Sequence, residues 1–239
     1  MRTSRLITAS IAASLVTALA CQKVKFPAAP ASFTVVHAMF NGNSIVPKFG
    51  TDTANRYYVG STGGNTMVRV GYGGSQLYSP VAGTSPLSVV PITDTGFKIF
   101  NGNIALQSGA IYSFFLSGDT AHADTLLVKD EIPYYADSSA GVRFVNLSVG
   151  GKALTINLTS DTTLTPVATL GYRQLSGFLK YPANMAVGGS YSFDIRDQAT
   201  GDLLASCSWS YPRFKNSTIV IAGSTDPSGT LNPFTVNNY

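Results

Sequence analysis

The feature that most constrains this chain is its rhythm of short β-branched and aromatic segments separated by Gly, Pro, Ser and Asn. No segment shows a sustained helical period with a capping residue, so the pattern predicts an all-β protein. In the first half we expect strands over 33–40, 45–49, 56–61, 66–72, 87–92, 96–100 and 110–116. In the second half we expect them over 142–148, 153–159, 167–172, 178–181, 191–196, 205–211, 217–222 and 234–236.

Local patterns sharpen some of these strands. Asn41-Gly42 tolerates the positive φ angles of tight turns and predicts a hairpin between 33–40 and 45–49. The letters Phe-Asn-Gly-Asn, found at 40–43, return at 100–103. The continuous apolar run 110–116 is typical of a strand buried on both faces.

The segment 205–211 has the cleanest alternation in the chain. A period of two places Cys207 and Trp209 on one face with Ala205 and Tyr211, and three serines on the other. We therefore expect Trp209 in the core and Cys207 as a buried, inert thiol.

The two halves of the chain resemble each other at a period of about one hundred residues. Val70-Gly71-Tyr72 with Gln76-Leu77 parallels Leu170-Gly171-Tyr172 with Gln174-Leu175, Phe97-Lys98-Ile99 parallels Phe193-Asp194-Ile195, and 110–118 parallels 217–223. This repetition predicts two tandem immunoglobulin-like antiparallel β-sandwiches, at 33–130 and 141–239. The segment 131–140 is expected to be the linker between them.

The N-terminus has the layout of an export signal. Arg2 and Arg5 precede a short apolar run that ends in small residues before Cys21. The cysteine resembles the lipidated residue of bacterial lipoproteins, which implies a signal over 1–20, a diacylglycerol on Cys21 and a Pro- and Ala-rich tether over 21–32. The alternative is an ordinary secreted protein cut near Ala20. Lipidation would make the membrane a partner, and the absence of Asp after Cys21 favours the outer membrane, on either side.

The second half is similar to a bacterial family defined only as a domain of unknown function, number 4397. The similarity rests on 141–148 (GVRFVNLS), 170–172, 177–179 and the strand, turn and strand of 191–209. The first half departs from the family with a Gly-rich insertion and with His-Ala-Met in place of the opening motif. The resemblance implies a β-sandwich in the cell envelope, and it implies no activity and no catalytic residues.

Candidate catalytic and metal-binding groups are sparse. The chain has one glutamate, and it contains no nucleophile elbow, His-Glu-x-x-His pair or phosphate-binding Gly loop. His37 lies inside a predicted strand, where a hydrogen-bonded structural role is expected. Asp119, His122 and Asp124 would suit a divalent ion, but a solvated loop is the favoured interpretation. We expect no cofactor, and the net charge of +4 falls to +2 without Arg2 and Arg5, so no basic stripe remains for nucleic acid.

Two surface patterns suggest ligands or modification. Asp-Thr-Ala, Asp-Thr-Leu and Asp-Thr-Thr triplets resemble the acceptor of a bacterial O-glycosylation system, which makes Thr53, Thr120, Thr125 and Thr162 candidate sites in predicted loops. Asp and Thr also simply favour turns.

Aromatic pairs give a second hint. Tyr57 and Tyr58 are candidate rings for stacking on a ligand, while Tyr134 and Tyr135 are expected to wedge the two sandwiches together.

Together these patterns predict a non-enzymatic envelope lipoprotein that acts as a binding, adhesion or scaffold module for a glycan or a protein. Two alternatives stay open. One is a glycan-active or metal-dependent enzyme whose site is assembled from distant loops. The other is a strand-exchanging subunit of a surface fibre, which would need an uncovered edge at 33–40 or at the C-terminus.

Overall fold

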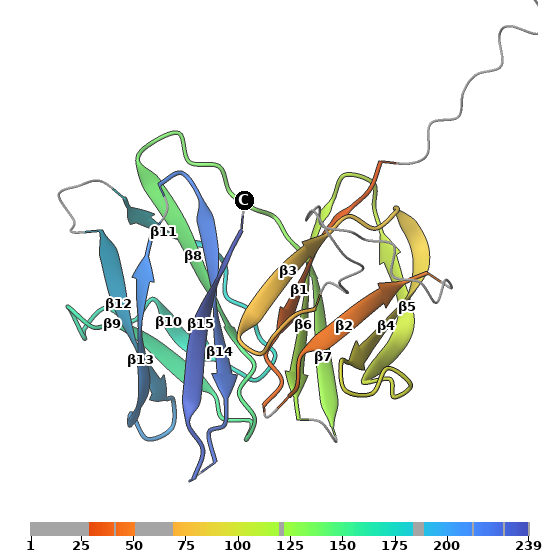
Figure 1. Ribbon diagram of the computed structural model, residues 1–239. Coiled ribbons are helices and arrows are strands. Elements are labelled where there is room, and N and C mark those ends of the chain that lie inside the picture. The colour runs from red at the N-terminus through yellow and green to blue at the C-terminus, as the bar shows by residue number, and fades with distance from the viewer. Residues whose placement is uncertain are drawn as a thin grey trace, which may run out of the picture.

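The computed structural model describes residues 29–40, 42–50, 69–119, 122–183, 189–211, 213–226 and 228–238. These residues form strands and no helix, which confirms the all-β prediction (Figure 1). The strands of the first half are β1 (Ser32–His37), β2 (Ile45–Phe49), β3 (Gly74–Tyr78), β4 (Gly83–Pro91), β5 (Phe100–Leu106), β6 (Ile111–Gly118) and β7 (Ala123–Lys129). Those of the second half are β8 (Ser139–Asn146), β9 (Leu154–Leu158), β10 (Val167–Leu170), β11 (Leu179–Pro182), β12 (Ser190–Asp197), β13 (Leu203–Ser210), β14 (Asn216–Gly223) and β15 (Leu231–Asn237).

The first sandwich packs the sheet β3-β1-β6-β7 against the sheet β2-β4-β5. Its core is aromatic: the Phe33 ring meets Phe49 edge-on at 5.4 Å and stacks on Phe114 at 5.9 Å. The expected strand 45–49 is confirmed as β2, whereas the expected strand 56–61 lies outside the described residues.

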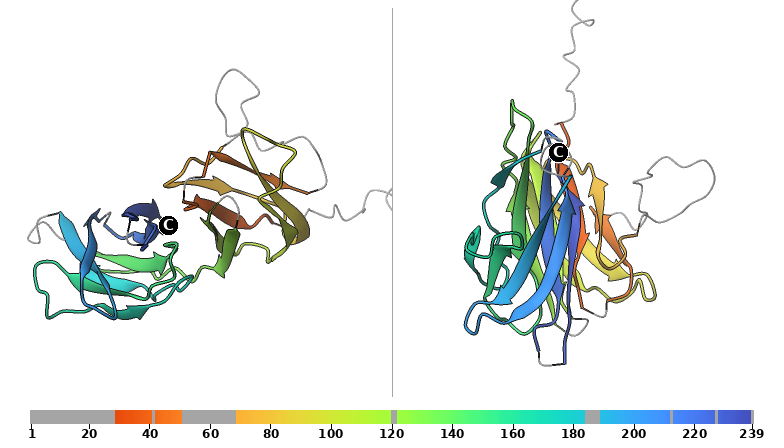
Figure 2. Two further views of the ribbon diagram at one scale, coloured as in Figure 1. Left: turned by 90° about the horizontal axis from the view of Figure 1, so that it is seen from below. Right: turned by 90° about the vertical axis from the view of Figure 1, so that its left-hand side faces the viewer.

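The second sandwich packs the sheet β11-β8-β14-β15 against the sheet β10-β9-β12-β13. Along β13 the serines are exposed and Trp209 is fully buried, so the predicted alternation and the core position of Trp209 are confirmed. Figure 2 shows the two sandwiches as neighbouring units when they are viewed from below.

Apart from β10, which adds a fourth strand to one sheet of the second sandwich, both sandwiches have the same topology, which confirms tandem immunoglobulin-like sandwiches. In each, the first strand pairs antiparallel with one neighbour and parallel with the other: β1 with β3 and β6, and β8 with β11 and β14. The parallel pairs depart from the expected purely antiparallel sheets. They arise because the chain leaves the first strand for the opposite sheet and returns several strands later.

The repeat is confirmed at some positions and shifted at others. Gly74 N–H donates to Gly71 O and Gln174 N–H to Gly171 O, both at 3.0 Å, so the turns after 70 and 170 are equivalent. Gln174 therefore matches Gly74, and the proposed match with Gln76 is wrong by two residues. Phe193 to Ile195 lie in β12, whose equivalent is β4, so the match with 97–99 is also wrong.

The predicted hairpin at 41–42 is wrong. β1 and β2 belong to different sheets, and Gly42 lies in the corner that carries the chain across the sandwich. The second Phe-Asn-Gly-Asn, at 100–103, is not a turn and forms the start of β5. Local turn chemistry allowed the hairpin at 41–42, but pairing with distant strands decided otherwise.

The two sandwiches share an apolar interface formed by their inner sheets. A separate cluster joins both halves: Val36, Ala38, Phe115, Val145, Leu147, Val220, Ala222 and Val236. This interface explains why β6 is buried on both faces, as predicted, and why β8 and β14 are as well. Tyr134 is 86% exposed and Tyr135 packs beside Lys180 of the second sandwich, so the expected tyrosine wedge is wrong.

The interface is reciprocal. The turn after β10 reaches β7, where the Tyr172 hydroxyl donates to Asp124 Oδ2 at 2.8 Å. The equivalent turn of the first sandwich reaches β15, where Gly73 lies against the Phe234 ring. Each sandwich thus offers the same elements to the other, as in an isologous contact.

Candidate functional site

Most of the predicted site residues lie outside the described part of the chain: Cys21, Thr53, Tyr57, Tyr58 and Thr120. Of the two remaining glycosylation candidates, Thr162 is exposed in a turn, as expected. Thr125 lies in strand β7 and not in a loop, because its segment pairs with β6.

The acidic loop after β6 does not assemble a metal site. Asp119 Oδ1 accepts the His122 N–H at 2.7 Å and closes a turn, while the Asp124 carboxylate bonds to Tyr172 and Arg173 of the second sandwich. Within the described residues, no three His, Cys, Asp or Glu side chains come together as a metal-binding group.

Cys207 is a protonated thiol at neutral pH. Burial, reinforced by the nearby Asp194 carboxylate, raises the pKa of Cys207 to about 12. A thiolate is the nucleophilic form, so this value agrees with the inert thiol that we expected.

The strongest candidate site is an open cavity at one side of the second sandwich, with a volume of about 360 Å³. It lies between the end of β9, the turn that leads into β10, and β11. Its lining is mostly apolar: Leu158, Leu164, Thr165, Pro166, Leu179, Lys180 and Tyr181. Because β10 and β11 are the edge strands of their sheets, the cavity opens where the sandwich is not closed by a further strand.

A hydrogen-bonded turn holds the upper wall of the cavity. Leu158 N–H donates to Leu164 O at 3.1 Å, and Leu164 N–H donates to Asp161 O at 3.0 Å. Asp161 Oδ1 accepts both the amide and the hydroxyl of Thr163, and the hydroxyl bond is the main cause that lowers the pKa of Asp161. The turn therefore presents Leu164, which is 52% exposed, at the rim.

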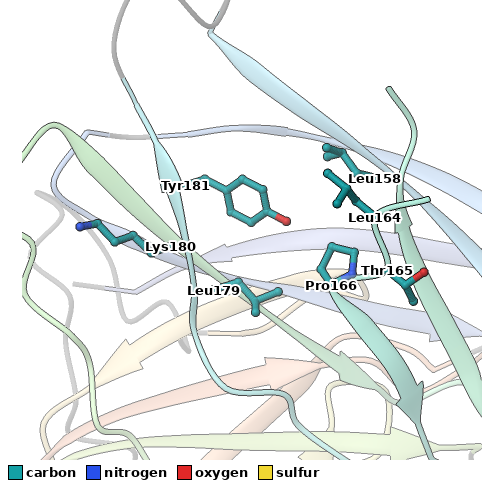
Figure 3. Close-up of a pocket in the computed structure, with 7 residues that line it drawn as sticks. All are labelled: Leu158, Leu164, Thr165, Pro166, Leu179, Lys180 and Tyr181. Atoms are coloured by element: carbon teal, nitrogen blue, oxygen red, sulfur yellow. The ribbon is translucent and has the colours of Figure 1, made fainter. Parts of the chain in front are cut away.

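The opposite wall is β11, where alternation sorts the side chains. Figure 3 shows the Tyr181 ring pointing into the cavity toward Leu164, while Lys180 points away. Lys180 Nζ donates to Asp137 Oδ2 at 2.7 Å and lies 5.6 Å from the centre of the Tyr135 ring. The ammonium group is thus engaged outside the cavity.

Tyr181 is backed by a cluster of aromatic rings. Its ring centre lies 4.7 Å from Tyr191, 5.7 Å from Phe193 and 6.1 Å from Trp209. Burial, and then the neighbouring Tyr191, raise the pKa of Tyr181, so its hydroxyl is neutral at physiological pH. Within the described residues no hydrogen bond of this hydroxyl is found, and the segment 184–188 that follows β11 lies outside them.

The chemistry of the lining limits the class of ligand that can bind in the cavity. Asn157 Nδ2 donates to Thr165 Oγ1 at 2.8 Å, so that hydroxyl is already engaged. A sugar ring placed here would meet three leucines, a proline and the Tyr181 hydroxyl, so the lining offers few hydrogen-bond partners for its own hydroxyls. An apolar or aromatic side chain fits the same surface without that cost.

Sequence reasoning missed this cavity. Leu158 and Leu164 lie at the end of β9 and in the turn after it, whereas Leu179 lies on β11 in the other sheet, and each taken alone is an ordinary core candidate. The available signal was the alternation of 179–181 in a short strand, which would have placed Leu179 and Tyr181 on one face.

The fibre alternative loses one of its two candidate edges. β1 lies in the middle of its sheet, so 33–40 offers no edge. β15 is an edge strand without charged residues, but it is flanked by β13 and β3 and contains Pro233.

No protein-family model matches the chain. No curated protein matches it. One solved structure that it resembles is described as "Alpha-glucan binding by a streptococcal virulence factor", with 12% identity, a TM-score of 0.26 and coverage of 84% of this chain and 97% of that chain. We infer nothing about the ligand from that similarity. No described segment is a helix long and apolar enough to span a membrane.

Proposed function

We propose that this protein is a non-enzymatic lipoprotein of the cell envelope whose second sandwich binds a protein partner. The observation that carries the proposal is the open, mostly apolar cavity at the edge of β11, with the Tyr181 ring in its wall. The double sandwich would act as a support that presents this cavity to the partner.

The occupant is an apolar or aromatic side chain on an extended segment of the partner. β11 pairs with β8 on one side only, so its other side can pair with an added strand over 179–181. The pairing would stop at Pro182, which has no N–H and whose carbonyl accepts the Tyr191 hydroxyl at 2.9 Å. The side chain would then enter between Leu164 and Tyr181, and the bonds to β11 would fix its register. A glycan is the second candidate from the sequence, and the apolar lining argues against it at this cavity.

Membrane attachment rests on the sequence. The layout before Cys21 supports a lipid anchor, and the tether to Ser32 would connect it to β1. Labelled palmitate should enter the wild-type protein and not Cys21→Ala. Continued membrane binding of Cys21→Ala would overturn the anchor while leaving the cavity proposal intact.

A displayed library of random extended peptides tests the cavity. Selection on the soluble part, from Phe26 onward, should enrich sequences with an apolar or aromatic anchor residue. Their binding should fall at least about tenfold on Tyr181→Ala, roughly 1.4 kcal/mol or more of lost contact. Leu203→Ala is the matched control, because Leu203 is 53% exposed on β13, far from the cavity.

A glycan array on the same proteins separates the two ligand classes. The proposal expects no glycan whose binding depends on Tyr181. A glycan hit that disappears in Tyr181→Ala and persists in Leu203→Ala would replace the protein partner with a sugar.

A further inference from the structure

Each sandwich has a corner directly after its first strand, and a different side chain holds each corner in place. β1 ends at His37 and β8 ends at Asn146, and both residues are fully buried. Gly73 N–H donates to His37 O at 2.9 Å, and Arg173 N–H donates to Asn146 O at 2.7 Å. The two residues therefore occupy equivalent places in the repeat.

Their side chains make matching bonds. Asn146 Oδ1 accepts the Ser148 N–H at 3.1 Å, and Asn146 Nδ2 donates to Lys152 O at 2.9 Å. His37 Nδ1 accepts the Met39 N–H at 3.3 Å, and His37 Nε2 lies 2.8 Å from Asn43 O. In both corners one side-chain atom accepts the backbone N–H two residues later, and another donates to the backbone carbonyl six residues later. The imidazole of His37 therefore makes the same two bonds as the carboxamide of Asn146.

This arrangement requires a neutral imidazole. Met39 N–H is a donor, so Nδ1 must carry no proton, and Nε2 must carry one to donate to Asn43 O. A protonated ring has two donors and no acceptor, so it would present N–H to the Met39 N–H. An asparagine has no such alternative state in the physiological range.

The corner leaves little room for the ring to rearrange. A Cβ on Gly42 would lie 2.8 Å from His37 Cε1, so the backbone closes directly over the imidazole. The titratable ring that contacts His37 is Tyr72, edge-on at 6.0 Å. The same corner borders a small cavity of about 130 Å³ that Met39 and Asn43 line with Phe97 and Ile99.

We propose that the corner after β1 is an acid-sensitive element of the first sandwich, in which protonation of His37 breaks the bond from Met39 and loosens the wall of the adjoining cavity. The equivalent corner of the second sandwich stays closed, because Asn146 does not titrate. Acid thus acts on one half of a repeated frame and spares the half that holds the proposed binding cavity.

The direction of the pH effect follows from burial. Burial lowers the pKa of His37 below its ordinary value of 6.5, and the bond to Asn43 offsets this in part. Above 6.5 the imidazole is neutral in the folded and unfolded chains, and its contribution to stability is complete. As the pH falls below 6.5, His37 takes up a proton in the unfolded chain before it does so in the folded chain. The free energy of unfolding therefore decreases between pH 6.5 and the lower pKa of His37 in the folded protein.

Amide hydrogen exchange tests the proposal within one molecule. The Met39 and Ser148 amides are the matched pair, since each donates to the corner side chain. After correction for intrinsic exchange, the opening of Met39 should increase up to about tenfold per pH unit below 6.5, the limit for one proton. Ser148 should not change. Equal behaviour of the two amides would overturn the proposal.

Two variants separate titration from general loosening. His37→Asn copies the second corner and should make Met39 exchange independent of pH. If that variant does not fold, Asn146→His should instead transfer the acid response to Ser148. If Met39 exchange in a folded His37→Asn protein still responds to pH as in wild type, the role of His37 is contradicted. The same holds if Ser148 exchange in a folded Asn146→His protein shows no acid response.

Discussion

The two sides of the interface between the sandwiches share one hydrogen bond and differ in one charge. On one side Ser113 Oγ donates to Asp130 Oδ2, and on the other Thr218 Oγ1 donates to Asn238 Oδ1, both at 2.6 Å. Only Asp130 is a carboxylate, and Arg143 Nη2 donates to its Oδ1 at 2.7 Å.

The charge difference extends to the neighbouring residues. Arg143 Nε also donates to Thr218 Oγ1 at 2.9 Å, and its guanidinium lies over the Phe178 ring. The equivalent position in β1 is Thr34, which has no long side chain and borders a hollow of about 210 Å³ at the seam. The bond donated by the Ser113 or Thr218 hydroxyl is therefore common to both sandwiches. The ion pair between Asp130 and Arg143 occurs on one side of the interface and has no equivalent on the other.

The largest effect is expected from breaking the charged side. Asp130→Ala leaves the Arg143 guanidinium buried without its carboxylate, since the paired side chains are 1% and 4% exposed. We expect a loss of about 3–5 kcal/mol in the free energy of unfolding. The matched change on the neutral side, Asn238→Ala, should cost about 1–3 kcal/mol. Urea unfolding of both variants measures these losses. Equal losses for Asp130→Ala and Asn238→Ala would contradict the distinction between the charged and the neutral side.

Smaller, equal effects are expected where the two sandwiches are alike. Gly118 and Gly223 end β6 and β14 with φ values of 82° and 97°. A Cβ at these positions would collide with the carbonyl oxygens of His122 and Thr230. Gly118→Ala and Gly223→Ala should each cost about 1–3 kcal/mol by urea unfolding. A marked difference between them would show that the corners are not equivalent.

The cavity lies in the second sandwich, so a change there should affect binding and spare folding. Leu164→Asp places a charge at the rim and should weaken a selected peptide at least about tenfold. Leu203→Asp, with similar exposure, should leave binding unchanged. Both variants should unfold within about 0.5 kcal/mol of wild type. Equal loss of binding in both would point to a nonspecific apolar surface.

The smallest effect concerns modification beside the cavity. Thr162 is exposed in the turn that presents Leu164, so a glycan there would extend from the rim. Intact mass of the native protein should show added sugar that Thr162→Ala reduces without a change in stability. Thr125→Ala should not reduce it, because Thr125 lies in β7 and its carbonyl accepts Arg173 Nη2 at 2.7 Å. A native mass without sugar would end the glycosylation hypothesis.

The sequence correctly predicted the burial of residues within single strands, where the pattern of apolar and polar residues spans only a few positions. The alternation of 205–211 correctly placed Trp209, and the unbroken apolar run of 110–116 correctly indicated two buried faces. Asn41-Gly42 misled because a tolerant turn does not say which sheet the next strand joins. That choice depends on pairs such as Phe49 with Leu87, which are distant in the chain.

The candidate site was less predictable than the fold. Asp130 and Arg143 flank a linker and gave no sign of pairing, and Leu164 and Tyr181 meet only after two strands have been placed. His37 was correctly expected to be structural, but its equivalence to Asn146 needed the hydrogen bonds. Sites built from distant residues carry no linear motif.

Photocrosslinking in the native cell envelope tests the central claim most directly. A photoreactive residue at 164 should give discrete crosslinked bands with a protein partner, and these should disappear when Tyr181→Ala is added. The same residue at 203, equally exposed on the opposite edge, should give none of these bands. Identical patterns at both positions, or bands that persist without the Tyr181 ring, would contradict a binding site at the open edge of the second sandwich.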